Sequence, residues 1–290
     1  MKFLHILLLT APLLVLSACS SPGAPKPDDP GDSSREAFDI DFVFGPGIAD
    51  DQQEVFEDAA ARWEQVITGD LPDTPLSKEE DACEQGDPAF EGTVDDLLIY
   101  VNAAPRDGSR GVLGAGGPCF TREGSSLPLY GTLELDSADL DEPTSLILHE
   151  IGHVLGLGLL WHDLELTREC PDDLRYFGEG AGEAWRALGG PGNLLVEDAP
   201  GAPDTQCVHW EGEVFGRELM TSQVKDGDDA PLSRLTVGAL EDLGYEVDAS
   251  AADAYRLPDT VRAAAHPARL EEVLLLPTWH VDEDGEVTRR

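Results

Sequence analysis

Basic residues are scarce in this chain. Its 290 residues include 19 Lys and Arg against 58 Asp and Glu, which gives a formal net charge of −39. A surface with so much negative charge repels the phosphate backbone of nucleic acids and anionic lipid headgroups. The composition therefore excludes a nucleic-acid partner and favours a soluble, acidic globular protein. At this length, one large domain or two small ones are expected.

Long hydrophobic runs are also missing, except at the start of the chain. Lys2 is followed by an apolar stretch from Leu4 to Leu16, which is too short to span a membrane and is typical of a signal peptide. The sequence Leu-Ser-Ala-Cys ending at Cys19 resembles a bacterial lipobox, which implies cleavage before Cys19 and lipidation of its thiol. The alternative is an ordinary signal peptide with an incidental cysteine.

These features predict the first part of the domain organisation. Residues 1–18 form the signal peptide, and residues 19–36 are rich in Pro, Ser, Gly and Asp, as expected of a flexible, lipid-anchored tether. The predicted location is the bacterial cell envelope, outside the cytoplasm, with lipidated Cys19 holding the protein to a membrane.

Cysteine is rare, and no Cys-x-x-Cys spacing occurs. Apart from Cys19, the chain has only Cys83, Cys119, Cys170 and Cys207. Four cysteines in an exported protein favour two disulfides over a metal site, and three pairings are possible. We favour Cys83–Cys119 and Cys170–Cys207.

The strongest motif is His-Glu-x-x-His, formed by His149, Glu150 and His153. Residues four apart lie on the same face of a helix, so both imidazoles can bind one metal ion while Glu150 acts as a general base. The surrounding residues are almost all apolar, which predicts a buried helix, and three ionisable groups there would be costly without a metal. The motif therefore predicts a catalytic Zn²⁺ ion.

Hydrophobic periodicity predicts an α+β domain. Strands are expected at 38–44, 97–101 and 131–136, and helices at 51–67, around the zinc motif and at 236–243. The glycine-rich stretch 108–118 is expected to be a surface loop, and residues 70–92 are expected to be loop-like. In the tail, residues 273–276 are a candidate for one added strand.

A catalytic zinc ion usually has three protein ligands, so a third ligand must lie elsewhere. In the metzincin pattern a Gly follows the second His by three residues, and a third His follows that Gly by three. Gly156 fits this pattern, but position 159 is Leu159. From the residues alone, His162 and His209 both remain candidates.

Several further segments resemble the leishmanolysin-like zinc metalloproteases of the metzincin clan, in their bacterial lipoprotein branch. The segments that carry this resemblance are His-Trp-Glu at 209–211, Glu-Leu-Met-Thr at 218–221, 232–245, Ala-Ala-Ala-Arg-Trp at 59–63, 94–97, 107–108, 113–118, 127–128, Gly131, Asp136 and 155–158. The resemblance covers roughly residues 38–247.

The resemblance implies a metzincin-like fold with a small mixed sheet and an insertion before the third zinc ligand, which would be His209. Met220 would be the structural Met-turn residue packed beneath the metal. Ser222 stands where some metzincins have an extra Tyr ligand. No pro-segment with a zinc-covering Cys is evident before Phe38, which leads to the expectation that the enzyme is secreted in an active form.

The functional prediction is a lipid-anchored zinc metalloendopeptidase acting on protein or peptide substrates. Residues 37–248 would form the catalytic domain and 249–290 a C-terminal extension. By resemblance, the strand Gly131–Asp136 is the candidate edge for substrate binding. The alternatives are a non-catalytic, zinc-containing binding or adhesion lipoprotein and a zinc hydrolase for non-peptide bonds. A calcium site at Asp136, Asp139 and Asp141 has weaker support, because it lacks EF-hand spacing.

Overall fold

The computed structural model describes residues 37–106, 108, 112–138, 144–198, 206–222, 230–258 and 271–290. All of these belong to one unit, Arg35–Arg290. The strands are β1 (Ile40–Phe44), β2 (Thr74–Lys78), β3 (Phe90–Val94), β4 (Leu97–Ala104), β5 (Val112–Arg122), β6 (Pro128–Asp136), β7 (Glu271–Leu274), β8 (Trp279–Val281) and β9 (Val287–Arg289). The helices are α1 (Asp50–Glu64), α2 (Thr144–Val154), α3 (Glu179–Ala187), α4 (Gly212–Phe215), α5 (Arg234–Leu243) and the 3₁₀ turn Ala249–Ala251.

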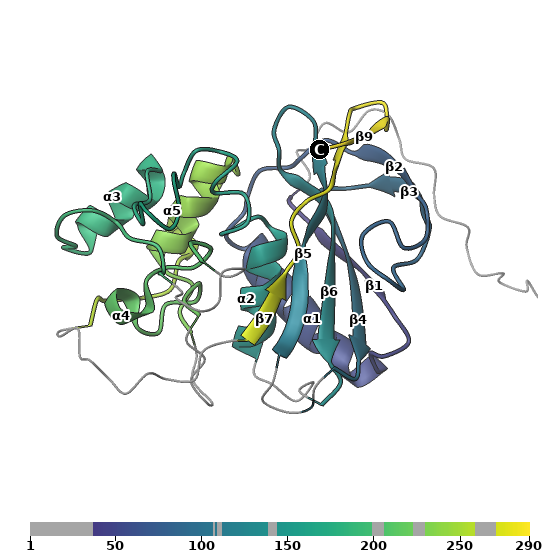
Figure 1. Cartoon of the computed structure of the whole chain (residues 1–290), viewed down its shortest axis with the longest axis horizontal. Helices are drawn as coiled ribbons and strands as arrows, with labels where there is room; N and C mark the ends of the chain where they lie inside the picture. Colours follow the sequence, from purple (N-terminus) through teal and green to yellow (C-terminus); the bar gives the residue numbers. More distant parts are fainter. Residues whose placement is uncertain are drawn as a thin grey trace, which may run out of the picture. The chain divides into compact units, whose positions relative to one another are not determined.

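The main sheet is mixed, with the strand order β1-β4-β6-β5-β8-β9. Strands β1, β4 and β6 are parallel, and β5 runs antiparallel to β6. Strands β7 and β8 both pair with β5 on its other side and run parallel to it (Figure 1). Strands β2 and β3 form a separate antiparallel pair. A mixed sheet with separate helices confirms the α+β class.

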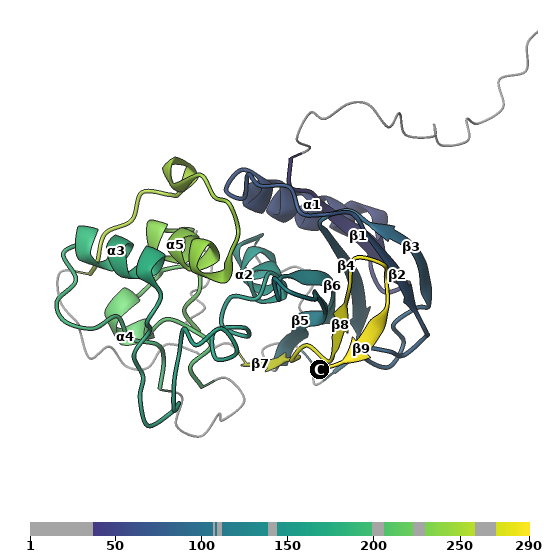
Figure 2. The same cartoon turned by 90° about the horizontal axis from the view of Figure 1, so that it is seen from above.

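Helices α1 and α2 lie together on the same side of the sheet (Figure 2). Helix α1 buries Phe56, Ala59, Ala60 and Trp63, which recur at helical spacing in the sequence. The indole Nε1–H of Trp63 donates a 3.0 Å hydrogen bond to the carbonyl of Leu148 in α2. This bond and the apolar contacts fix α2 against α1.

Between α2 and the tail, turns and irregular segments connect the short helices α3, α4 and α5, and α3 packs against α5. Asp242 of α5 joins the two helices, because its carboxylate accepts hydrogen bonds from the backbone N–H groups of Gly180 and Ala181 and from the Tyr176 hydroxyl. Gly244 ends α5 in a left-handed conformation with φ of 114°. Helix α3 lies inside the long insertion that separates α2 from His209.

Two loop expectations are wrong. The stretch 108–118 is not a surface loop, since β5 begins at Val112 and is paired on both sides. Glycine lowers intrinsic strand propensity, but here it permits close packing, because a Cβ on Gly116 would lie 2.5 Å from the Leu133 side chain. Residues 70–92 likewise contain β2 and the start of β3.

The expected edge strand is also corrected. Gly131–Asp136 lies within β6, which pairs with β4 on one side and β5 on the other, so it has no free edge. The outer edge of the β1-β4-β6-β5 sheet is β5, and residues of the C-terminal extension occupy that edge. The extension is therefore part of the same sheet, with β7 at the place where one added strand was expected.

Two disulfides link the pairs favoured from the sequence, Cys83–Cys119 and Cys170–Cys207, with sequence separations of 36 and 37. Loops of this length stabilise a fold by about 2–4 kcal/mol when closed by a disulfide. Disulfides persist in oxidising compartments, so the pair suggests an extracytoplasmic protein.

The signal peptide, the tether and Cys19 lie outside the described residues. Within the described ranges, none of the helices combines the length and the apolar character needed for a bilayer crossing. Asp139 and Asp141 of the calcium candidate also lie outside these ranges. Asp136 is buried, and its carboxylate accepts hydrogen bonds from the backbone N–H groups of Gly108 and Ala138.

Candidate metal centre

Helix α2 carries the first two histidines into the interior. Every residue from Leu146 to Val154 is buried, including His149, Glu150 and His153. The Nε2 atoms of His149 and His153 lie 3.0 Å apart, as their spacing of four residues allows on one helical face. Just beyond α2, Gly156 has a φ of 98°, and this left-handed conformation stops the helix from continuing.

His209 joins this pair from far downstream. Its Nε2 lies 3.0 Å from that of His153, across 56 residues of sequence, and its ring stacks on His149 with centroids 5.2 Å apart. The backbone around it is fixed by hydrogen bonds from the Glu197 N–H to the His209 carbonyl and from the Trp210 N–H to the Met220 carbonyl. The structure thus brings His149, His153 and His209 together, and these three residues are called the histidine cluster below.

The other ring nitrogen of each histidine faces an oxygen outside the cluster. Nδ1 lies 2.7 Å from the Leu219 carbonyl for His149 and 2.9 Å from the Leu157 carbonyl for His153. For His209, Nδ1 lies 3.5 Å from a carboxylate oxygen of Glu197. These acceptors favour the tautomer with the proton on Nδ1, which leaves the Nε2 lone pairs facing one another. Three converging lone pairs repel unless a cation lies between them, so the geometry fits a metal ion.

Glu272, from β7, completes the cluster. Its carboxylate oxygens lie 2.9 Å from Nε2 of His209, 3.6 Å from that of His153 and 3.7 Å from that of His149. The four residues are all buried and could hold a metal ion such as zinc. Three imidazoles and one carboxylate are a donor set that zinc accepts in tetrahedral geometry.

The charges around the cluster favour a cation. Burial lowers the pKa of His209, but the carboxylates of Glu272 and Glu197 outweigh burial and raise it to about 9. Burial lowers the pKa of His153 to about 3, which keeps that ring neutral. Glu197 at Nδ1 and Glu272 at Nε2 of His209 are two buried carboxylates that favour positive charge at the cluster, either a proton on His209 or a metal ion in its place.

Glu150 is the acidic residue of the motif and is also fully buried beside the cluster. Burial raises its pKa well above the usual range, and the neighbouring Glu272 carboxylate raises it further. Among the described residues, no N–H group donates a hydrogen bond to either oxygen of Glu150. A buried carboxylate with no N–H donor is costly, and functional sites are where such groups concentrate.

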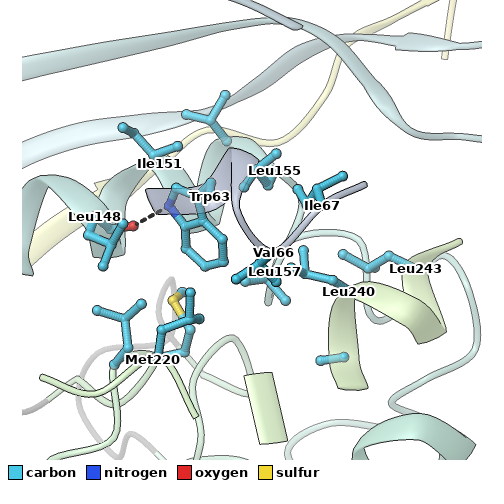
Figure 3. Close-up of a cluster of buried hydrophobic side chains, with 14 of the residues drawn as sticks. Trp63, Val66, Ile67, Leu148, Ile151, Leu155, Leu157, Met220, Leu240 and Leu243 are labelled. Carbon is cyan, nitrogen blue, oxygen red and sulfur yellow. Dashed lines mark hydrogen bonds between the residues drawn. The ribbon is translucent and has the colours of Figure 1, made fainter. Parts of the chain in front are cut away.

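Met220 lies beneath the cluster. A Cβ on Gly152, between the two histidines of α2, would lie 2.8 Å from the Met220 sulfur and 3.1 Å from the Trp63 ring. Figure 3 shows Trp63 and Met220 together beside Leu148 of α2. Met220 therefore packs against the turn that carries both imidazoles, at a position where a side chain larger than glycine would displace its thioether.

The turn before Met220 is held by Glu218, a residue to which the sequence analysis assigned no role. The buried carboxylate of Glu218 accepts hydrogen bonds from the Met220 N–H and from the hydroxyls of Ser233 and Thr236. Burial raises the pKa of Glu218 to about 7. These bonds tie the turn to α5, and the Leu219 carbonyl from the same turn orients His149.

The other third-ligand candidate, His162, lies elsewhere. Its side chain is 76% exposed and faces Asp163 at 3.7 Å. Carboxylates often orient the histidines that bind zinc, and the structure shows which acidic residues face the cluster. In the structure Asp163 pairs with Arg290, Glu211 caps α4 and Asp242 caps α3, whereas Glu197 faces His209.

Two other features do not form competing sites. Asp70, Asp95 and Asp96 lie close together, but Asp96 accepts hydrogen bonds from the backbone N–H groups of Asp39 and Leu71, which explains its burial. A cavity of about 850 Å³ lies near the N-terminal ends of α2 and α5, and neither Glu272 nor any residue of the histidine cluster lines it. Comparison of the chain with protein-family models and with curated proteins finds no match.

A substitution at Glu197 tests whether the contacts made by the Nδ1 atoms of the histidines support metal binding. Glu197→Gln is expected to weaken zinc binding by about 10–100-fold, because it removes the charge that orients His209. Zinc affinity is measured by competition with a chromophoric chelator. Asp163→Asn, which removes a carboxylate near the surface, is the matched control and should leave the affinity unchanged. Equal affinities for wild type and Glu197→Gln would show that this contact does not support the metal.

Proposed function

We propose that this chain is a zinc metalloendopeptidase that hydrolyses peptide bonds, with His149, His153 and His209 as zinc ligands and Glu150 as general base. The observation that carries the proposal is the position of Glu150 on the same helical turn as two of the imidazoles, as a buried carboxylate to which no N–H group of the described part of the chain donates. A purely structural zinc site has no chemical need for such a group. The resemblance to leishmanolysin-like metzincins supports the same conclusion.

The chain's own residues perform the proton transfers. When bound, zinc supplies Lewis acidity, which polarises the peptide carbonyl and lowers the pKa of a bound water to about 7. Glu150 takes the proton from the attacking water at its carboxylate and then donates it to the leaving amine nitrogen. The imidazoles of the histidine cluster hold position through their Nδ1 contacts.

An extended peptide substrate would pair with a sheet edge, since main-chain hydrogen bonds give binding without dependence on sequence. Strand β5 is the candidate edge, because it borders the cluster: a Cβ on Gly116 would lie 3.7 Å from a carboxylate oxygen of Glu150. This assignment replaces the earlier choice of Gly131–Asp136. Lipidation at Cys19 and retention at a membrane remain part of the proposal.

One observation favours a second candidate function. Glu272 supplies a fourth protein ligand, and zinc sites closed by four protein ligands are usually structural. On that reading the chain is a zinc-containing binding or adhesion lipoprotein without turnover. The two candidate functions differ in whether Glu272 can leave the fourth coordination position of the zinc ion.

Peptide hydrolysis tests the proposal. The full chain and its Glu272→Ala variant, each loaded with zinc, are assayed on casein and on quenched fluorescent peptides. We expect cleavage by at least the variant, loss of cleavage with a chelator and recovery when zinc is restored. Stoichiometric zinc in both proteins without cleavage of any substrate would contradict the endopeptidase assignment and favour the binding lipoprotein.

A further inference from the structure

The outer edge of β5 is covered by the chain's own C-terminal segment. Strand β7 pairs with β5 in parallel register, from Val112 with Glu271 to Gly116 with Leu274. Backbone hydrogen bonds from Leu275 N–H to the Gly116 carbonyl and from Thr278 N–H to the Cys119 carbonyl continue the contact toward β8. Figure 1 shows β7 beside β5, close to α2. The edge that a substrate would use is therefore occupied.

The segment approaches β5 at a position where only glycine fits. A Cβ on Gly117 would lie 2.2 Å from the Leu275 carbonyl oxygen, and Gly117 itself has a φ of 158°. Any larger residue there would push the segment away from the sheet. The sequence of β5 thus accommodates the segment.

Little apolar burial holds this part of the tail, defined here as the tail segment, Glu271–Leu276. Val273 is 41% exposed and Leu276 is 67% exposed, although both are large apolar residues. Glu272, by contrast, is only 7% exposed, and its carboxylate lies against the histidine cluster. A buried carboxylate requires a positive partner. The Glu272 carboxylate and its positive partner at the cluster, together with the backbone pairing to β5, therefore contribute to the docking of the tail segment.

The residues after the tail segment are anchored more firmly. The Trp279 ring stacks on Phe120 of β5 with centroids 6.1 Å apart, and its Nε1–H donates to the Ala82 carbonyl. Val281 is buried in an apolar cluster with Phe120 of β5 and Leu129 of β6. Release of the tail segment can therefore leave β8 and β9 in the sheet.

A cavity of about 540 Å³ adjoins the tail segment and reaches Glu272. Its other walls include Gly158, Leu159 and Val208, from the segments that follow α2 and precede His209. This volume is in the range of small-ligand pockets. Removal of the tail segment would join the cavity to the metal site and to the β5 edge, giving one continuous cleft.

We propose that the tail segment is a built-in inhibitor of this site. The Glu272 carboxylate takes the fourth metal position, and β7 takes the β5 edge, so that release of the segment opens both at once. This inference rests on the proposed function, because it concerns access to the same site. It differs from the expectation of an enzyme secreted in an active form, since the covering group comes from the C-terminal side of the domain.

Metal access can be measured without reference to catalysis. The full chain is loaded with Co²⁺, and binding of acetohydroxamate, a small metal-chelating probe, is followed by the visible absorption spectrum. An intramolecular carboxylate competes at high effective concentration, so Glu272→Ala is expected to bind the probe roughly 100-fold more tightly than wild type. Glu271→Ala, a change of the neighbouring acid in β7, is the matched control and should behave as wild type.

Three results would overturn the inference. The first is equal probe affinity for wild type and Glu272→Ala. The second is loss of the metal in Glu272→Ala, which would make Glu272 a permanent ligand. The third is measurable peptide hydrolysis at equal rates by these two proteins, which would leave the proposed function intact. If the probe affinity rises but no substrate is cleaved, the inhibitory contact stands and the endopeptidase assignment fails.

A second variant separates the contribution of β7 pairing from that of the Glu272 carboxylate. Leu275→Pro removes the N–H that donates to Gly116 but keeps Glu272. We expect tighter probe binding than in wild type and faster peptide hydrolysis, because a loosened β7 presents Glu272 less often. Probe affinity and hydrolysis equal to those of wild type would show that pairing with β5 does not contribute to the block.

Discussion

Glu150→Gln is expected to lower kcat for peptide hydrolysis by about 10²–10⁴-fold, the usual contribution of general acid–base catalysis. The substitution keeps the size of the side chain but removes the group that accepts and returns the proton. The three imidazoles that face the metal are unchanged, so zinc content should stay at the wild-type level. The two measurements are steady-state hydrolysis of a fluorescent peptide and metal analysis of the same preparation.

The Glu150→Gln substitution is tested in a protein whose metal site is open. Because the tail segment covers the site, the comparison is made between Glu272→Ala and the double variant with Glu150→Gln. Loss of turnover with retained zinc supports Glu150 as the base. Undiminished hydrolysis in the double variant would remove Glu150 from the mechanism, whereas loss of zinc would make it a structural residue.

His209→Ala is expected to weaken zinc binding by more than the roughly 10–100-fold that an outer partner contributes. It removes one of three converging Nε2 donors and leaves Glu197 and Glu272 without the imidazole between them. His162→Ala should leave zinc binding unchanged, since that side chain is 76% exposed and lies outside the cluster. Competition titration with a chromophoric chelator measures both affinities.

The two histidine variants also separate the two candidates that the residues alone left open. A greater loss of affinity in His162→Ala than in His209→Ala would reverse the ligand assignment. Thermal unfolding without added metal is the control for folding, because His209 is buried and His162 is not. A lower unfolding temperature of a variant without metal would show an effect of the substitution on folding, apart from its effect on zinc affinity.

Local patterns predicted the parts of the fold that depend on local interactions. The periodic apolar residues of α1 and α5, and Gly244 at the end of α5, are signals contained within a few turns of helix. The spacing of His149 and His153 is also a local signal, because residues four apart in a helix lie on the same face. These elements lie close to their expected bounds.

Strand β5 could not be predicted in the same way. Its glycines reduce strand propensity, and the residues that stabilise it come from β6 and from the C-terminal extension. Glycine at 116 and 117 is explained only by the side chain of Leu133 and the backbone of Leu275, which pack against it. The edge assigned to residues 131–136 came from the resemblance, and it fails because β6 pairs with β5 as well as with β4.

The candidate site likewise combines residues that a local motif predicts with residues that only the fold brings together. His149, Glu150 and His153 follow from one motif, whereas the choice of His209 over His162 required a resemblance to known proteases. Glu272 had no signal of its own, since an acidic residue in an acidic tail is common. Its role depends on parallel pairing between β7 and β5, which brings distant parts of the chain together.

Anomalous X-ray diffraction from crystals of the zinc-loaded protein, recorded on both sides of the zinc absorption edge, tests the metal centre most directly. The expected result is one strong peak between the Nε2 atoms of His149, His153 and His209, with the Glu272 carboxylate on its open side. A peak elsewhere, or none at the histidine cluster in crystals that contain zinc, would contradict the zinc site on which the proposed function depends.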